Sequence, residues 1–247
     1  MLNTLTSTLN GAPTNITLNF RLHSASIDRS GGFVFLYPTA VDLGAPRHAS
    51  QVYVWDTDLD TVTALTSGGA DGSPATHAGG HDAPGYGNSV NHDCCVSTSW
   101  DAGQWELRRL DAPLVAWDLV SPVLTPQEIY LSDHPTWNNA RPEVLVAFFN
   151  ATFRYRNNPA PWRPWDEEII GVRTDVPLGA TVWRYAHHRS AVGSDTDASV
   201  RYFWYEPRPN VSRDGRWVIF TSNWEKTLGT DPGTNTARQD VFLLAIP

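Results

Sequence analysis

The segment Asn210-Val-Ser-Arg-Asp-Gly-Arg-Trp-Val-Ile-Phe-Thr-Ser-Asn-Trp224 decides the fold. It predicts a short strand, a tight turn at Asp214-Gly215 and a second strand that is apolar on both faces. The stretch Ser26-Ile-Asp-Arg-Ser-Gly-Gly-Phe-Val-Phe-Leu36 is a weaker copy, in which Ser30-Gly31 aligns with the Asp-Gly pair. Each copy is followed by a further expected strand. Repetition of such a unit is typical of a β-propeller.

Four units of this kind can be marked along the chain. They cover about residues 20–67, 85–120, 128–188 and 203–247. The last unit has three expected strands and lacks a fourth. Residues 5–19 have the alternating pattern of strands, so we predict that they complete the last unit and close the ring. The expected fold is therefore a single all-β domain over residues 1–247, a four-bladed propeller. A five-bladed ring and a part of a larger propeller remain alternatives. An incomplete ring would expose a sheet edge and favour a homo-oligomer.

The second unit is expected to begin with a strand at residues 87–90 and to continue with one at 94–100. The latter contains the two cysteines of the chain, Cys94 and Cys95. Adjacent cysteines cannot cross-link distant parts of a fold, so the chain has no disulfide framework. Reduced thiols on a strand, a strained vicinal disulfide and a metal or redox role remain open.

The composition excludes several classes of protein. Of the 247 residues 41% are hydrophobic and 11% aromatic, which is enough for a packed core. The net charge is −8, Lys226 is the only lysine, and the arginines form no basic stripe, so nucleic acid is not an expected partner. No stretch approaches the roughly 20 apolar residues of a membrane span. The first eight residues lack the pattern of a signal peptide.

The motif around Asp214-Gly215 also carries a family resemblance. The matching pattern is P-x-x-S-x-D-G-x-x-I/V-x-F-x-S, and the matching residues are Pro209, Ser212, Asp214, Gly215, Val218, Phe220 and Ser222. It resembles the propeller repeats of TolB-type periplasmic proteins and their WD-repeat-like relatives, closely over residues 203–247 and less closely over 22–66. The resemblance implies a propeller scaffold in a bacterial protein of the periplasm or the extracellular space. It implies no activity, because these residues make a turn and pack between blades.

Candidate binding residues stand at or beside the expected strand ends. One lies in each unit and could line a central channel: His23, His92, His134 and Arg208. A histidine there could serve as a metal ligand or a base, or could instead hydrogen-bond the backbone between blades.

The pair His187-His188 is followed by Arg189. Adjacent side chains of a strand point to opposite faces, so the two histidines cannot bind one metal together. His188 and Arg189 are therefore separate candidates for ligand binding. Trp137 and Asn138 could offer a ring and an amide to a sugar, with Trp162, Trp165 and Trp224 as further rings, although tryptophans between blades can equally be core.

Two functions follow as expectations, and the leading one requires no cofactor. The leading one is a non-catalytic recognition propeller that binds a glycan or a protein on its loop-rich face or in its central channel. The alternative is a carbohydrate-active enzyme such as a metal-assisted polysaccharide lyase, a class that includes enzymes with a similar scaffold. A full set of the metal ligands and bases of such lyases cannot be placed on this sequence.

Overall fold

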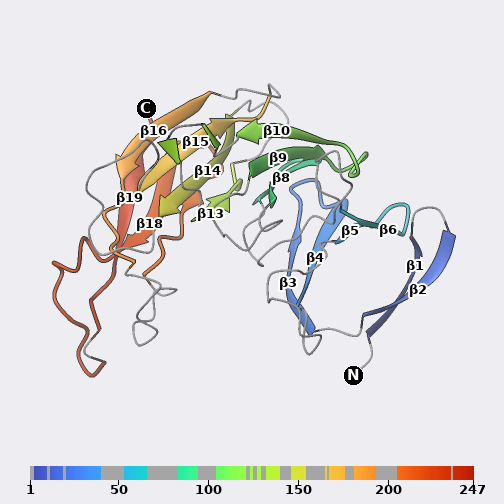
Figure 1. Cartoon of the computed structure of the whole chain (residues 1–247), viewed down its shortest axis with the longest axis horizontal. Coiled ribbons are helices and arrows are strands. Elements are labelled where there is room, and N and C mark those ends of the chain that lie inside the picture. Colours follow the sequence, from blue (N-terminus) through green and yellow to red (C-terminus); the bar gives the residue numbers. More distant parts are fainter. Residues whose placement is uncertain are drawn as a thin grey trace. The chain divides into compact units, whose positions relative to one another are not determined.

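The fold was analysed in a computed structural model. It describes residues 3–9, 12–18, 21–39, 53–65, 83–93, 104–120, 123–124, 127–128, 132–139, 146–153, 165, 167–175, 181–192, 205–234 and 236–247. These residues form strands and turns and no helix, which confirms the all-β prediction (Figure 1). None of them therefore belongs to a helix long and apolar enough to cross a membrane. The chain divides into two compact units, which are larger than the four predicted repeats. The first unit comprises residues 1–121 with 176–179, and the second comprises residues 122–175 with 180–247. From here on, first and second unit refer to these two.

The first sheet of the first unit has six strands. In spatial order they are β2 (Ala12–Leu18), β1 (Asn3–Leu9), β6 (Thr61–Ala64), β5 (Tyr53–Asp56), β4 (Phe33–Thr39) and β3 (Arg21–Ile27). Neighbouring strands are antiparallel except for β1 and β6, which are parallel. Strands β3 to β6 are therefore the meander that the first predicted unit requires.

The N-terminal strands correct the predicted closure of the ring. β1 and β2 pair with each other, with Leu9 opposite Ala12, and β1 then adds to β6, with Leu9 beside Val62. The sequence Asn10-Gly11 lies between the two strands, and Asn-Gly is the preferred sequence of a two-residue hairpin loop. The N-terminal segment is thus used by the first sheet and does not complete the last one.

In the second sheet the strand order differs from the prediction for residues 85–120, because one more strand comes first. Its order is β10 (Ala116–Val120), β9 (Gln104–Arg109), β8 (Asn88–Asp93) and β7 (Ala83–Pro84). The segment expected to be the first strand is therefore the second, because the short β7 precedes it. The predicted strand at residues 94–100, with Cys94 and Cys95, lies outside the described residues.

A buried apolar cluster joins the first two sheets. Phe35 and Val54 of the first sheet and Leu65, which follows β6, pack with Leu110, which follows β9, and Phe33 packs against them. The backbone also connects the sheets, since Arg29 N–H donates to Gly85 O at 2.7 Å.

The second unit contains a short hairpin and two larger sheets. The hairpin is β11 (Val123–Leu124) with β12 (Gln127–Glu128). One sheet has the order β13 (Ser132–Thr136), β14 (Val146–Phe153), β15 (Glu168–Arg173) and β16 (Val182–His187). The other has three strands among the described residues, β17 (Asn210–Val211), β18 (Trp217–Ser222) and β19 (Asp240–Ala245).

The core of the second unit lies between its two larger sheets. Ile169 of β15 packs with Val211, Val218 and Phe220 of the three-stranded sheet. Partly buried side chains extend this cluster: Tyr185, Phe242, Leu244 and Ile246. Alternation along β18 explains the packing, because Val218 and Phe220 face the core while Trp217 and Ile219 face outward.

The Asp-Gly turn that decided the fold has the expected geometry. Gly215 has a φ of 73°, Ser212 N–H donates to Trp217 O at 2.8 Å, and Gly215 N–H donates to Ser212 O at 2.9 Å. Only glycine adopts such a φ without strain. Among the described residues no sheet closes on itself.

Candidate functional site

Left-handed backbone conformations of non-glycine residues gather at one end of the second unit's sheets. Glu167 precedes β15, Arg189 follows β16, and Trp224, Glu225 and Lys226 follow β18, all with φ between 47° and 63°. The backbone N–H of Glu225 donates to Arg189 O at 2.6 Å, which joins the segment after β18 to the segment after β16. Each such residue costs about 1–3 kcal/mol, and such strain tends to gather at functional sites. This end of the unit is therefore the candidate site.

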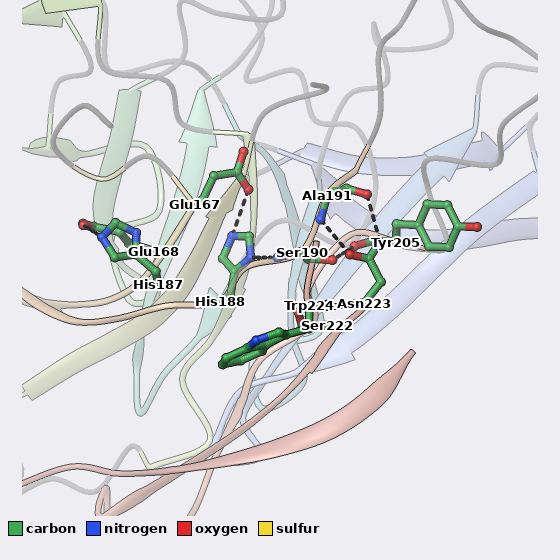
Figure 2. Close-up of polar contacts among 10 residues, drawn as sticks. All are labelled: Glu167, Glu168, His187, His188, Ser190, Ala191, Tyr205, Ser222, Asn223 and Trp224. Atoms are coloured by element: carbon green, nitrogen blue, oxygen red, sulfur yellow. Dashed lines mark hydrogen bonds and ion pairs between the residues drawn. The ribbon is translucent and has the colours of Figure 1, made fainter. Parts of the chain in front are cut away.

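The buried pair Glu167 and His188 fixes the strand ends at this site (Figure 2). The His188 N–H of the backbone donates to Glu167 O at 2.9 Å, and the side-chain Nε2 lies 3.4 Å from Glu167 Oε2. The Nδ1 atom accepts the backbone N–H of Ser190 at 3.0 Å. Because Nδ1 is an acceptor here, the proton of a neutral ring is on Nε2 and faces the carboxylate. His188 therefore has a structural role.

The neighbouring pair faces a different glutamate. Figure 2 shows His187 beside Glu168, and its Nε2 lies 3.6 Å from Glu168 Oε1. Glu168 Oε2 also accepts Arg184 Nε–H at 2.7 Å and the backbone N–H of Trp165 at 3.1 Å. The hydrogen bonds to Glu168 raise the pKa of Arg184, so its guanidinium stays charged. His187 and His188 thus contact separate carboxylates, as the strand geometry predicts.

Asn223 holds the loop after β16 against the loop after β18. Its buried amide accepts the Ala191 N–H at 2.8 Å and donates to Ala191 O at 2.9 Å, in the manner of a paired strand (Figure 2). The same Oδ1 accepts the Lys226 N–H at 3.3 Å, and Ser222 Oγ accepts the Trp224 N–H at 2.9 Å. These bonds offset the strain of the left-handed residues and fix their positions.

An ion pair over an aromatic ring is one part of this site that reaches solvent. Arg189 Nη2 lies 2.8 Å from Glu225 Oε1, and the two side chains are 40% and 33% exposed. The guanidinium lies 5.4 Å from the centre of the Trp224 ring, which also stacks on Phe242 at 4.9 Å. Trp224 therefore supports Arg189 while it packs on the core, and the partly exposed charges of Arg189 and Glu225 remain within reach of a ligand.

The other predicted site residues of the second unit lie elsewhere in it. His134 Nε2 is 2.7 Å from the buried Glu206 Oε2, so this histidine is paired within the fold. Trp137 is buried, and Asn138 Nδ2 donates to Asn210 Oδ1. Arg208 is exposed.

The side chains of the remaining predicted residues lie outside the described part of the chain. His23 lies in β3 and His92 in β8, so they belong to the first compact unit, and their side chains are outside the described part of the chain. Trp162 also lies outside it. Among the described residues no three His, Cys, Asp or Glu side chains are grouped so that they could hold a metal ion.

Comparison with known proteins adds no name to this geometry. The chain matches no family model and has no significant match among curated proteins. The sequence singled out His188 and Arg189 but not their partners Glu167 and Glu225, nor Asn223, which bonds the backbone of Ala191. The available signal for Asn223 was its place at the end of the Asp-Gly motif segment, directly after β18.

Proposed function

We propose that this chain is a non-catalytic recognition module of propeller architecture that binds a glycan at the loops carrying Arg189 and Glu225. The observation that carries this proposal is the exposed Arg189–Glu225 pair on left-handed backbone held by buried hydrogen bonds. Inference from strained backbone to function is justified where the surroundings hold the strain in place. Here Asn223 and Ser222 hold it.

The chemistry of the pair suits a glycan. A guanidinium offers only donors and a carboxylate only acceptors, whereas each sugar hydroxyl can donate and accept. Two neighbouring hydroxyls can therefore bond Arg189 and Glu225 at once, with charge-assisted hydrogen bonds. A loop already fixed before binding loses little entropy when the ligand arrives. A protein ligand is less favoured because the exposed groups are polar and the adjacent Trp224 is already stacked on Phe242.

The propeller part of the proposal is supported by the sheets. The strands β7 to β10, β13 to β16 and β17 to β19 each form a sheet of sequential antiparallel neighbours, and β3 to β6 are such neighbours within the six-stranded sheet. This order is that of propeller blades. The resemblance of residues 203–247 to TolB-type repeats supports the same architecture, with the periplasm or the extracellular space as the expected location.

The enzymatic alternative depends on histidines, and no described contact favours it. His188 is fully buried, with Nδ1 used as an acceptor and Nε2 directed at Glu167. His134 is paired with Glu206. A binding role for the exposed Arg189–Glu225 pair needs neither ring.

The test is a binding measurement with neutral and uronic-acid oligosaccharides on an array, followed by calorimetry with any oligosaccharide that is retained. We expect Arg189→Ala and Glu225→Ala to weaken binding at least about tenfold, since each removes charged hydrogen bonds. Arg173→Ala is the matched control, because Arg173 forms a similar exposed pair with Asp175 in the same unit. Retention of no oligosaccharide by the parent chain, or equal binding by Arg189→Ala, would overturn the proposal.

A further inference from the structure

Strand β19 differs from the other sheet edges of the second unit. Natural edges are protected by charges, prolines, bulges or short length, because an open edge pairs with other strands. β13 carries Pro135, and β17 has two residues. β16 carries Arg184 and His187 and has a bulge at Tyr185, since Ile169 pairs with Ala186 and Ile170 with Arg184. β19 pairs with β18 in unbroken register and contains only Val, Phe, Leu, Leu and Ala after Asp240.

The outward backbone groups of β19 can be identified. Ile246 N–H donates to Arg216 O at 2.8 Å, so residue 246 faces β18. Successive residues of a strand direct their N–H and C=O groups to alternate sides. Val241, Leu243 and Ala245 therefore direct theirs away from β18. The sheet has three strands among the described residues, whereas the sheets β7 to β10 and β13 to β16 have four each.

The exposure of the side chains gives the same picture. Val241 and Leu243 are each 64% exposed, whereas Trp217 and Ile219, on the same face of the interior strand β18, are 46% and 45% exposed. A neighbouring strand on both sides accounts for the lower values on β18. On the other face, Phe242 and Leu244 belong to the core cluster but are only partly buried. A further strand beside β19 would cover both rows.

We propose that this edge binds the same edge of a second copy of the chain, so that two β19 strands pair antiparallel about a two-fold axis at Leu243. In this register Leu243 faces its counterpart, and Val241 faces Ala245 of the other copy. Every outward N–H and C=O of the three residues then finds a partner. Phe242 lies opposite Leu244, which continues the core row across the junction.

The second copy is favoured over an unrelated strand because β19 is its own complement. An incoming strand must be apolar on both faces, and β19 has Val241 and Leu243 on one face and Phe242 and Leu244 on the other. Pairing of identical edges makes a closed, isologous contact that ends at two copies. A single strand pair is a small interface, so we expect a dissociation constant on the order of 10 µM.

The test uses the full chain in sedimentation velocity from about 1 to about 100 µM. The parent should shift from monomer to dimer over this range. Leu243→Lys places two like charges opposite each other and should weaken the dimer at least about tenfold. Ile219→Lys is the matched control, because Ile219 lies directly opposite Leu243 on β18, on the same face but away from the edge. It should leave the dimer intact.

A cross-link gives a second and independent readout. Leu243→Cys should form a disulfide-linked dimer on mild oxidation, identified by mass spectrometry of the linked peptide, with the parent as the control for Cys94 and Cys95. Ile219→Cys should not, since its counterpart would be about 14 Å away, three strand spacings, which is beyond disulfide reach. A parent that stays monomeric, assemblies larger than dimers, or equal cross-linking at both positions would overturn the proposal. If Leu243→Lys fails to fold, the cross-link decides.

Discussion

The turns at residues 28–33 and 212–217 make the same hydrogen bonds with exchanged side chains. The carboxylate of Asp28 accepts the Phe33 N–H at 3.0 Å, and the hydroxyl of Ser212 accepts the Trp217 N–H at 3.0 Å. In both turns a serine hydroxyl donates to an aspartate at 2.6 Å. The first turn thus has Asp28 in the first position and Ser30 in the third. The second turn has Ser212 in the first position and Asp214 in the third. The pattern of bonds is what the turn requires, and either residue order supplies it.

The two turns differ in what lies around them. Asp28 is 3% exposed and also accepts the Gly87 N–H at 2.9 Å, so its carboxylate fastens the second sheet to the first. Asp214 is exposed, and it accepts hydrogen bonds from Ser212 and Arg216 of its own turn. The same local design is therefore a junction between sheets where it is buried and only a turn where it is exposed.

Replacement of Asp28 should have the largest effect. Asp28→Ala removes the acceptor of four hydrogen bonds, from Ser30 N–H, Ser30 Oγ–H, Phe33 N–H and Gly87 N–H. We expect a loss of roughly 3–5 kcal/mol in the free energy of unfolding, because hydrogen bonds to a charged group are strong and four partly buried bonds are lost together. Urea unfolding followed by tryptophan fluorescence measures it.

The matched control is Ser212→Ala in the other turn. Ser212 is half-exposed, and its hydroxyl accepts one backbone N–H and donates to Asp214. Its loss should cost about 1 kcal/mol. Equal losses for the two variants would show that the buried junction with Gly87 adds nothing and would remove the distinction between the turns.

Glycine replacements should have an intermediate effect and test the backbone of the same two turns. Gly215 and Gly31 have φ of 73° and 80°. A Cβ on Gly215 would lie 3.6 Å from Asn139 Nδ2, whereas one on Gly31 would meet nothing within 4 Å. Gly215→Val should therefore cost about 1–3 kcal/mol, and Gly31→Val should fall toward the lower end of that range. Thermal unfolding of both variants measures the difference. An unchanged midpoint for Gly215→Val would contradict the turn assignment.

Local signals account for what the sequence predicted correctly. The Asp214-Gly215 turn, its Ser30-Gly31 copy and the strands on either side follow from residues within a few positions of each other. The N-terminal hairpin was equally local, since Asn10-Gly11 lies between two strands of seven residues. It was missed because the ring was expected to need these strands elsewhere. The second sheet was shifted because β7 has only two residues and lacks a strand pattern.

The candidate site could be predicted only in part, for a physical reason. His188 and Arg189 are conspicuous residue types, but their roles depend on partners far along the chain. Asn223 bonds Ala191 across 32 residues, and nothing in either local sequence selects the other. Trp137, for which the sequence left sugar binding and core packing open, is buried.

The smallest expected effect concerns the contribution of Asp214, in the exposed turn, to the pH dependence of stability. The hydrogen bond from the Ser212 hydroxyl, followed by that from the Arg216 backbone N–H, holds the pKa of Asp214 below its ordinary value. A carboxyl whose pKa is lowered by folding stabilises the fold above its unfolded pKa of about 3.9, and this contribution is lost as the pH falls through the lower folded value. In Asp214→Asn the free energy of unfolding should therefore decrease less steeply as the pH falls below about 4. Its dependence on pH near neutrality should change little.

An NMR titration of the Asp214 carboxyl separates this cause from general acid unfolding. In the Ser212→Ala variant the largest cause of the shift is gone, so the pKa of Asp214 should rise toward its ordinary value, while the Arg216 N–H keeps part of the shift. Arg238→Ala is a control that removes an exposed charge from the same unit without a bond to this turn. If the Asp214 titration moves as much in Arg238→Ala as in Ser212→Ala, the shift reflects the overall charge of the unit. The serine–aspartate bond common to both turns would then have no measurable electrostatic effect in the exposed one.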